Sequence, residues 1–294
     1  MVSRFNPTVT NNAVLTVENG VEIDMYDSEL IIDEGSSLII GDSVVFRAKR
    51  GANKISIYGN IQIGYNVTFT ADEGSTIELY FDSGSVAIPN CNFNNCTVRS
   101  FAEPLNITQS HFTNSTVLQL GFNMFVSKSH FENSFIKALN VSVEFPQRNK
   151  TVSVDSCTFF STDNNVEMPA IDVWSYDKFF IEYNTINGYY NGIQLQYSGA
   201  GNSGNQNLNN NEIYNSTMSG IMLFNSTSSI SSNHLHNNLK GLSIYDNCNV
   251  ALYGNPGAET YDEVNYITNN DSYEVYASSG SLPWKSLRTM ITAR

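Results

Sequence analysis

Apolar and small polar positions recur along this chain with one fixed internal spacing. An aliphatic residue is followed three positions later by a small polar residue and five positions later by a second apolar residue. The pattern occurs in eight copies, the last of them degenerate: Ile88-Cys91-Phe93, Ile107-Ser110-Phe112, Val126-Ser129-Phe131, Val154-Cys157-Phe159, Ile181-Asn184-Ile186, Leu208-Asn211-Ile213, Ile230-Asn233-Leu235 and Asp262-Asn265-Ile267. Copies start 19 to 32 residues apart, yet the spacing within a copy stays constant. Insertions between copies and none within them predict a solenoid, whose repeats stack on their neighbours.

Short strands are expected along the whole chain. Residues 14–82 alternate apolar and polar positions, as in Val21-Glu22-Ile23-Asp24-Met25, with Gly, Asp or Asn between the alternating segments. Period-two alternation with β-branched residues and such punctuation indicates strands, and no stretch has helical periodicity with caps. Copies about 20 residues apart fit one turn of a coil of three short strands. We therefore predict an all-β fold, a single-stranded parallel β-helix of about ten to twelve coils, and the resemblance given below implies that it is right-handed.

One β-helix domain is expected to cover residues 1–294. Residues 1–87 would form irregular strand-rich opening coils, residues 88–277 the regular coils, and residues 278–294 a C-terminal tail or cap without the repeat. A solenoid needs caps to cover its last core layer and its open strand edge. The sequence has neither clear caps nor a visible secretion signal. We therefore expect a segment of a larger multidomain chain.

Stacking of coils turns each repeat position into a column. An asparagine ladder is expected in the column of Asn184, Asn211, Asn233 and Asn265, each amide bonding the next. In later coils a second strand follows, with its first and third residues facing inward: Ile171-Asp172-Val173-Trp174, Ile193-Gln194-Leu195-Gln196, Ile221-Met222-Leu223-Phe224, Leu242-Ser243-Ile244-Tyr245 and Tyr273-Glu274-Val275-Tyr276. Gly192, Gly220 and Gly241 precede three of these strands, where we expect a turn that needs positive φ.

The amino-acid composition limits which classes of partner can be expected. The net charge is −13 with only 15 Lys plus Arg, so nucleic acid and anionic membranes, which need a basic footprint, are not expected partners. No apolar run approaches the roughly 18 residues that span a bilayer, so membrane insertion is not expected. The 39 asparagines predict many turns. Cys91 and Cys157 share a column about three coils apart, too far for a disulfide, and we expect small buried cysteines, with a Cys91–Cys96 bond left open.

The segment Asn211-Glu212-Ile213 with Gly220-Ile221-Met222-Leu223 resembles the right-handed parallel β-helix of the pectate-lyase-like superfamily. The opening coils, with Ile61-Gln62-Ile63-Gly64-Tyr65, look like β-helix regions of large secreted bacterial proteins. The resemblance implies the fold, which lyases, glycoside hydrolases, adhesins and passive stalks share. Polygalacturonase-like enzymes would also imply an adjacent Asp-Asp and a Gly-His-Gly, and neither string is present. Lyase-like sites would imply an Arg or Lys base, yet residues 151–284 hold only Lys178 and Lys240.

Two columns of ionisable residues are candidates for chemistry. Asp155 and Glu182 each follow the first core residue of adjacent coils, so they should stack on the outer face about 5 Å apart, near the separation of a retaining glycosidase pair. The alternative is a solvated pair on an acidic surface. His111 and His130 should stack likewise, but two histidines hold a metal only with further ligands. No metal site and no cofactor are therefore predicted, and His234 and His236 lie several coils away.

An aromatic column is the strongest candidate for binding. The fourth, outward position of the second strand holds Trp174, Gln196, Phe224, Tyr245 and Tyr276, and Tyr197 follows Gln196. Aromatic faces stack on sugar rings, and a regular row suits an uncharged polysaccharide. The predicted ligand-binding residues are Trp174, Tyr197, Phe224, Tyr245 and Tyr276. The alternative is that these rings stack on one another or lie under the inserts at residues 197–207 and 253–263.

We therefore expect a non-catalytic extracellular scaffold of a secreted or surface bacterial protein, which engages a polysaccharide or cell-surface glycan or mediates adhesion. The competing function is an enzyme, a glycoside hydrolase or lyase with Asp155 and Glu182 as its acid pair. A passive spacer is the third. The absence of the usual site motifs favours the scaffold.

Overall fold

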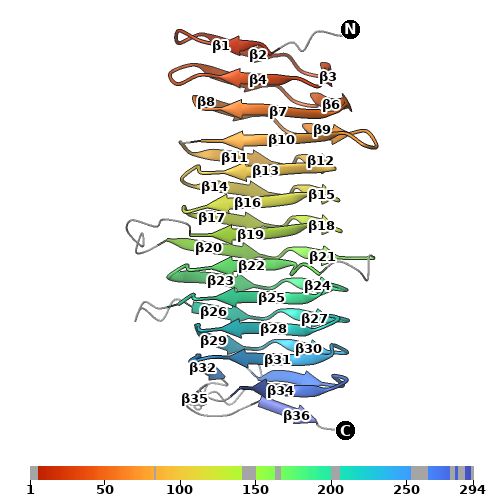
Figure 1. Cartoon of the computed structure of the whole chain (residues 1–294), viewed down its shortest axis with the longest axis vertical. Coiled ribbons are helices and arrows are strands. Elements are labelled where there is room, and N and C mark those ends of the chain that lie inside the picture. The colour runs from red at the N-terminus through yellow and green to blue at the C-terminus, as the bar shows by residue number, and fades with distance from the viewer. Residues whose placement is uncertain are drawn as a thin grey trace. The chain divides into compact units, whose positions relative to one another are not determined.

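Each of two compact units in this chain is a parallel β-helix (Figure 1). The units are Met1–Ser134 and Phe135–Arg294 in the computed structural model. It describes residues 6–82, 84–140, 150–162, 167–199, 206–252, 264–278, 282–283 and 289–292. Within them no helix forms that has the length and apolarity to cross a membrane. The all-β prediction is confirmed. A single domain over residues 1–294 stays a prediction, and most of the expected C-terminal tail lies outside the described residues.

The first unit wraps three sheets around its core. Sheet 1 orders β1 (Thr8–Val9), β4 (Glu29–Ile32), β7 (Ala52–Ile57), β10 (Thr76–Phe81), β13 (Cys96–Ser100) and β16 (Thr116–Leu120). Sheet 2 begins with β2 (Val14–Val17), β5 (Ser37–Ile40) and β8 (Asn60–Ile63) and resumes with β11 (Val86–Pro89), β14 (Leu105–Thr108) and β17 (Met124–Ser127). Sheet 3 orders β3 (Glu22–Tyr26), β6 (Val45–Arg50), β9 (Thr68–Ala71), β12 (Asn92–Asn94), β15 (His111–Thr113) and β18 (His130–Glu132).

The second unit has the same plan. Sheet 1 orders β19 (Phe135–Leu139), β22 (Ile171–Trp174), β25 (Asn191–Gln196), β28 (Ser219–Phe224), β31 (Lys240–Tyr245) and β34 (Tyr273–Ala277). Sheet 2 orders β20 (Thr151–Asp155), β23 (Lys178–Glu182), β26 (Gln206–Asn209), β29 (Thr227–Ser231), β32 (Asn249–Leu252) and β35 (Leu282–Pro283). Sheet 3 orders β21 (Thr158–Phe160), β24 (Thr185–Asn187), β27 (Glu212–Tyr214), β30 (His234–His236), β33 (Asn265–Thr268) and β36 (Thr289–Thr292).

The core consists of in-register columns, as the repeat predicts. Ile88 pairs with Ile107, and Phe93 pairs with Phe112, on neighbouring coils. In the first unit the inward residues of sheet 3 stack as nearly parallel rings: Phe46, Phe69, Phe93, Phe112 and Phe131, with centroids 5.3, 5.2, 4.5 and 4.7 Å apart in that order. These spacings follow the distance between neighbouring parallel strands, about 4.8 Å. The corresponding column of the second unit continues from Phe159 with aliphatic residues, beginning at Ile186.

The asparagine ladder forms as predicted. Nδ2 of Asn184 donates to Oδ1 of Asn211 at 3.0 Å, and Nδ2 of Asn211 donates to Oδ1 of Asn233 at 2.9 Å. Each Nδ2 also donates to a carbonyl of the preceding coil, and each Oδ1 also accepts a backbone N–H: for Asn211 these partners are the carbonyl of Ile181 and the N–H of Asn184. The buried amides of this column therefore satisfy one another and the turn backbone.

The turn residues only partly follow expectation. Asparagine supplies more of the described positive-φ positions than glycine does, which explains the asparagine excess. The prediction of positive φ at Gly192, Gly220 and Gly241 is wrong. These glycines are the second residues of β25, β28 and β31, where a Cβ on Gly220 would stand 2.8 Å from the carbonyl oxygen of Gly241. They are required by the close approach of neighbouring coils, because any side chain would meet backbone there.

The four cysteines are free and buried, so the Cys91–Cys96 disulfide does not form. Burial raises the pKa of the Cys91 thiol to about 12, and that of Cys96 likewise. Both thiols lie close to backbone carbonyls of their own turns, Cys91 to Pro89 and Cys96 to Asn94. These cysteines therefore behave as small core residues with little nucleophilic thiolate.

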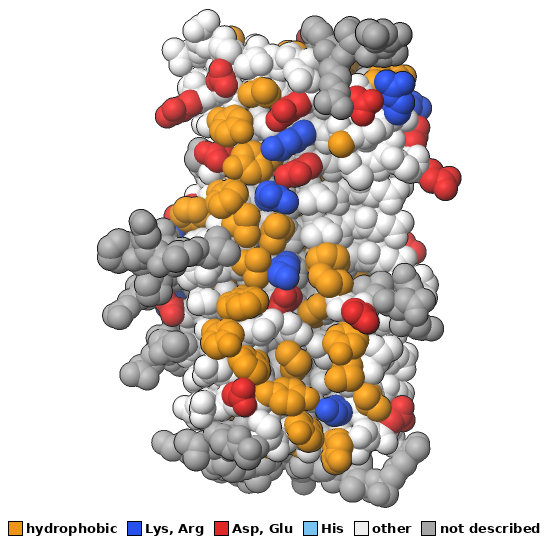
Figure 2. All heavy atoms as spheres, viewed as in Figure 1, with side chains coloured by type: hydrophobic (Ala, Val, Ile, Leu, Met, Phe, Trp, Pro, Cys, Tyr) orange, Lys and Arg blue, Asp and Glu red, His pale blue; other side chains and the backbone are white. Residues whose placement is uncertain are grey.

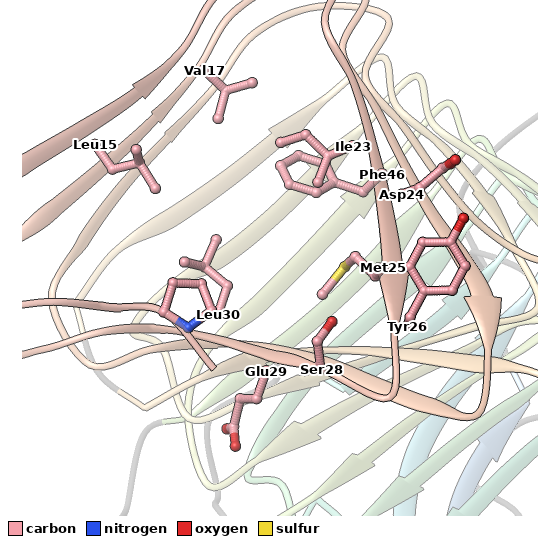
Figure 3. Close-up of a pocket in the computed structure, with 11 residues that line it drawn as sticks. Leu15, Val17, Ile23, Asp24, Met25, Tyr26, Ser28, Glu29, Leu30 and Phe46 are labelled. Carbon is pink, nitrogen blue, oxygen red and sulfur yellow. The ribbon is translucent and has the colours of Figure 1, made fainter. Parts of the chain in front are cut away.

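An apolar cavity of about 350 Å³ opens at the first coils. Figure 3 shows side chains from β2, β3, β4 and β6 around it, among them Val17, Met25 and Phe46. These residues belong to the inward columns of the first coils. The cavity is therefore the open start of the hydrophobic core within the described residues.

Asn211→Ala should destabilise the fold by at least about 2 kcal/mol. The change leaves the Nδ2 of Asn184 and the carbonyl of Ile181 without these partners, and a buried polar group without a partner costs about 1–3 kcal/mol. Urea unfolding followed by circular dichroism measures the loss. Asn249→Ala, at an exposed strand position of the same unit, is the control and should change stability by no more than about 0.5 kcal/mol. Equal losses in the two variants would contradict a stabilising ladder.

Candidate functional site

An exposed aromatic pair marks the outer face of sheet 1 in the second unit. Trp174 ends β22 and Tyr197 follows β25, and their side chains are 42% and 44% exposed. Their rings are nearly parallel, with centroids 5.9 Å apart and an interplanar angle of 23°. Figure 2 shows hydrophobic side chains gathered over this face. The two rings stack on one another, as the alternative for this column described, and both residues stay partly exposed on the outer face of the sheet.

The platform continues to the next coil. Phe224 at the end of β28 meets Tyr197 edge-on, with centroids 5.3 Å apart and an angle of 70°. Gln196 pairs in register with Trp174 on one side and with Phe224 on the other. Tyr197 enters the row because it has a φ of 50°, a turn conformation directly after the strand. We define the aromatic platform as Trp174, Gln196, Tyr197 and Phe224.

A second aromatic cluster begins on the next coil, in β31. Tyr245 pairs in register with Phe224. The alignment of Tyr276 with Tyr245 is wrong, because Tyr276 pairs with Ser243. The reason is that Val275, not Tyr273, continues the core column of Leu242.

The shift does not separate the two tyrosine rings. The rings of Tyr245 and Tyr276 still approach to 5.4 Å. The Lys240 ammonium donates to the Tyr245 hydroxyl at 3.1 Å and lies 4.4 Å from the Tyr276 ring centroid. These tyrosines therefore contact a cation as well as each other.

A buried carboxylate lies beside the aromatic platform, and sequence reasoning missed it. Asp172 occupies an outward position of β22, yet only 3% of it is exposed. Its carboxylate lies 3.5 Å from the Lys137 ammonium and accepts hydrogen bonds from the amides of Gln194 and Gln196. Burial raises the pKa of Asp172, while Lys137 and the two amides oppose the rise. The sequence signal was Lys137, which precedes Asp172 in the same outward column.

The acid pair stacks as expected. Asp155 of β20 and Glu182 of β23 are register partners and both are half-buried. Burial raises the pKa of Glu182, the Asp155 charge adds to the rise, and a hydrogen bond from Nδ2 of Asn209 opposes it. Ser156 donates to the Asp155 carboxylate at 3.2 Å. The pair therefore joins a polar column on the outer face of sheet 2.

Histidines form two separate groups. His111 and His130 pair in register with ring centroids 4.6 Å apart, as expected. His234 and His236, for which no role was predicted, lie with Glu212 on the outer face of sheet 3 in the second unit. The donor atoms of these three residues all lie within 4.8 Å of one another. The expectation of no metal-ligating group did not anticipate this cluster, because only the pairing of β27 with β30 brings Glu212 to the histidines.

The loops expected to cover the aromatic rings lie largely outside the described residues. The structure does not describe positions 200–205 of the first insert or any position of the insert 253–263. The expected absence of a cofactor stays a prediction, as do the binding roles of Trp174, Tyr197, Phe224, Tyr245 and Tyr276.

Comparison with known proteins supports the fold. No protein-family model matches the chain, and no curated protein matches it. Among solved structures it is similar to a variant of the periplasmic alginate epimerase AlgG, at 11% identity over 90% of this chain and 77% of the epimerase, with a TM-score of 0.56. Bacteriophage CBA120 tailspike protein 3 is also similar, at 10% identity over 99% of this chain and 56% of its own, with a TM-score of 0.38. At such identities the likeness to the epimerase shows the fold alone, and it confirms the parallel β-helix that the sequence resemblance implied.

Asp172→Asn should gain stability relative to the natural chain as pH rises. The native state holds the Asp172 proton more tightly than the unfolded chain does, because burial raises its pKa. Native stability therefore falls as pH rises from the ordinary aspartate pKa, about 4, through the raised value, whereas asparagine does not titrate. Urea unfolding of both proteins between pH 4 and pH 7 measures the difference. The exposed Asp271→Asn controls for the loss of one charge. A difference for Asp172→Asn that does not change with pH would be inconsistent with this sign.

Proposed function

We propose that this chain is a non-catalytic β-helix scaffold that binds an uncharged polysaccharide through the aromatic platform. The observation behind the proposal is the nearly parallel, exposed pair of Trp174 and Tyr197. Flat aromatic faces bury the apolar faces of sugar rings, and stacking keeps the two rings in place before a ligand arrives. Amides and a carboxylate at the edge of the rings, from Gln194, Gln196 and Asp172, supply hydrogen-bonding groups for sugar hydroxyls.

Charge favours a neutral ligand. The chain has a net charge of −13, and Lys137, the cation beside the platform, is paired with Asp172. The acidic chain would therefore repel an anionic polymer. Because Lys137 is paired, it does not offset that repulsion at the platform. The fold shared with a protein named as a periplasmic alginate epimerase is consistent with a carbohydrate partner and with a location outside the cytoplasm. We extend the proposal to an extracellular or cell-surface setting, in a larger multidomain chain, where binding would serve adhesion to a glycan.

Trp174→Ala should weaken polysaccharide binding at least 10-fold, about 1.4 kcal/mol, because it removes one of the two exposed rings. Neutral polysaccharides that bind on a glycan array are chosen first. Isothermal titration calorimetry of the full chain with them then measures the change in dissociation constant. Phe160→Ala is the matched control, since Phe160 is 41% exposed in the same unit but lies on sheet 3. Tyr197→Ala should resemble Trp174→Ala. Binding that survives both platform changes, or that is absent from every neutral glycan, would remove the basis of the proposal.

A polysaccharide hydrolase or lyase is the second candidate, and the Asp155–Glu182 pair favours it. Two stacked carboxylates, one with a raised pKa, are the groups that a retaining glycosidase uses as nucleophile and general acid. The enzyme would place its reaction on sheet 2, away from the aromatic platform on sheet 1.

The scaffold proposal predicts that no reducing ends appear when the full chain is incubated with a panel of neutral and uronate polysaccharides. A reducing-sugar assay, with ultraviolet detection of unsaturated products, makes the measurement. Release of product that Glu182→Gln abolishes and Glu132→Gln leaves intact would establish the enzyme instead. Glu132 is a suitable control because it is also half-buried on an outer face.

A further inference from the structure

The cluster of Glu212, His234 and His236 has the composition of a metal site. His234 and His236 flank the buried Leu235 in β30, so alternation along the strand points both imidazoles out of sheet 3. Glu212 in β27 is the register partner of His234. The Glu212 Oε1 lies 3.6 Å from Nε2 of His236 and 4.0 Å from Nδ1 of His234. Three potential donor atoms therefore converge on one point from two neighbouring strands.

The ring nitrogen of His236 is left without a hydrogen bond. Its Nε2 is buried and has no hydrogen-bond partner among the described residues. The nearest carboxylate oxygen, at 3.6 Å, is beyond hydrogen-bond distance. A buried polar atom without a partner is costly, and a bound ion or water is one of the established reasons for such an atom in a native protein.

The surroundings hold the His236 ring in place. Tyr214 stacks flat against it, with centroids 5.1 Å apart and an angle of 5°. The Asn237 side-chain Nδ2 lies 3.1 Å from Nδ1, the other ring nitrogen. In this orientation Nδ2 donates to Nδ1; with the amide flipped, which exchanges its oxygen and nitrogen, Nδ1 would donate instead, the usual way in which an outer partner orients a metal-binding imidazole. Nε2 is then the nitrogen that is free to bind.

From this arrangement we infer that Glu212, His234 and His236 bind a first-row transition-metal dication, with Zn²⁺ as the representative. Two imidazole nitrogens and one carboxylate oxygen are ligands that this class of ion prefers. Tetrahedral coordination with bonds of about 2.0–2.2 Å places donor atoms about 3.4 Å apart, so the observed 3.6 and 4.0 Å need only small side-chain rotations. Glu212 and His234 are about half exposed, which leaves the remaining coordination position open to water or an external donor.

The test is metal binding by the tag-free full chain after treatment with a chelator. Isothermal titration with Zn²⁺ should give one site, and Co²⁺ should produce the visible absorption of a site with nitrogen and oxygen ligands. His236→Ala and Glu212→Gln should each weaken Zn²⁺ binding at least 10-fold. Zn²⁺ should also raise the melting temperature of the natural chain and not that of these variants, because an ion that binds only the native state stabilises it.

His111→Ala is the matched control, since His111 and His130 form a stacked pair elsewhere in the chain with ring spacing similar to that of His234 and His236. It should leave Zn²⁺ affinity unchanged. Circular dichroism of each variant checks folding, because the substituted side chains point out of the sheet but His236 is partly buried. The inference is overturned if the natural chain binds no Zn²⁺, or if binding survives both site variants and is lost in His111→Ala.

Discussion

Hydrogen bonding between parallel strands in register governs everything else in this protein. Each coil presents its backbone to the next at the strand spacing, so each residue lies directly over its equivalent one coil away. Any side chain placed in a repeat position must therefore pack against its own counterpart. Phenylalanine satisfies this demand by forming parallel rings in the first unit, and aliphatic residues satisfy it in the second.

The same constraint makes polar columns possible inside the core. An amide has two donors and two acceptor sites, so an asparagine can bond its counterparts on both sides and still satisfy the turn backbone. Serine, with a single hydroxyl, forms a column with fewer hydrogen bonds in the first unit. There the Ser110 hydroxyl accepts from the backbone N–H of Cys91, and the Ser129 hydroxyl accepts from the backbone N–H of Ser110. Buried turns that would otherwise leave backbone groups without partners are in this way fully bonded.

On the outer faces stacking brings like groups together, and chemistry follows from which groups these are. Rings on sheet 1 give a partly exposed stack, carboxylates on sheet 2 give a pair with one raised pKa, and imidazoles with a glutamate on sheet 3 give converging donor atoms. A sheet that also bears the core holds these side chains in fixed positions. Preorganisation of this kind lowers the entropic cost of binding a ligand or an ion.

The sequence by itself determined the coil, the inward columns and the pairing of equivalent positions, because a fixed spacing within each copy allows only one register. It therefore predicted the asparagine ladder, the stacked histidines and the Asp155–Glu182 pair correctly. Tertiary structure alone decided the contacts between residues of different columns, and the register of coils that differ in length. Tyr276 shifted by two positions because Val275 fits the core column, and Asp172 became buried because Lys137, Gln194 and Gln196 converge on it from adjacent strands. Glu212 likewise lies beside two histidines that flank a single core residue. Its contact with His236 runs diagonally between neighbouring strands, and the repeat along the chain does not encode such a contact.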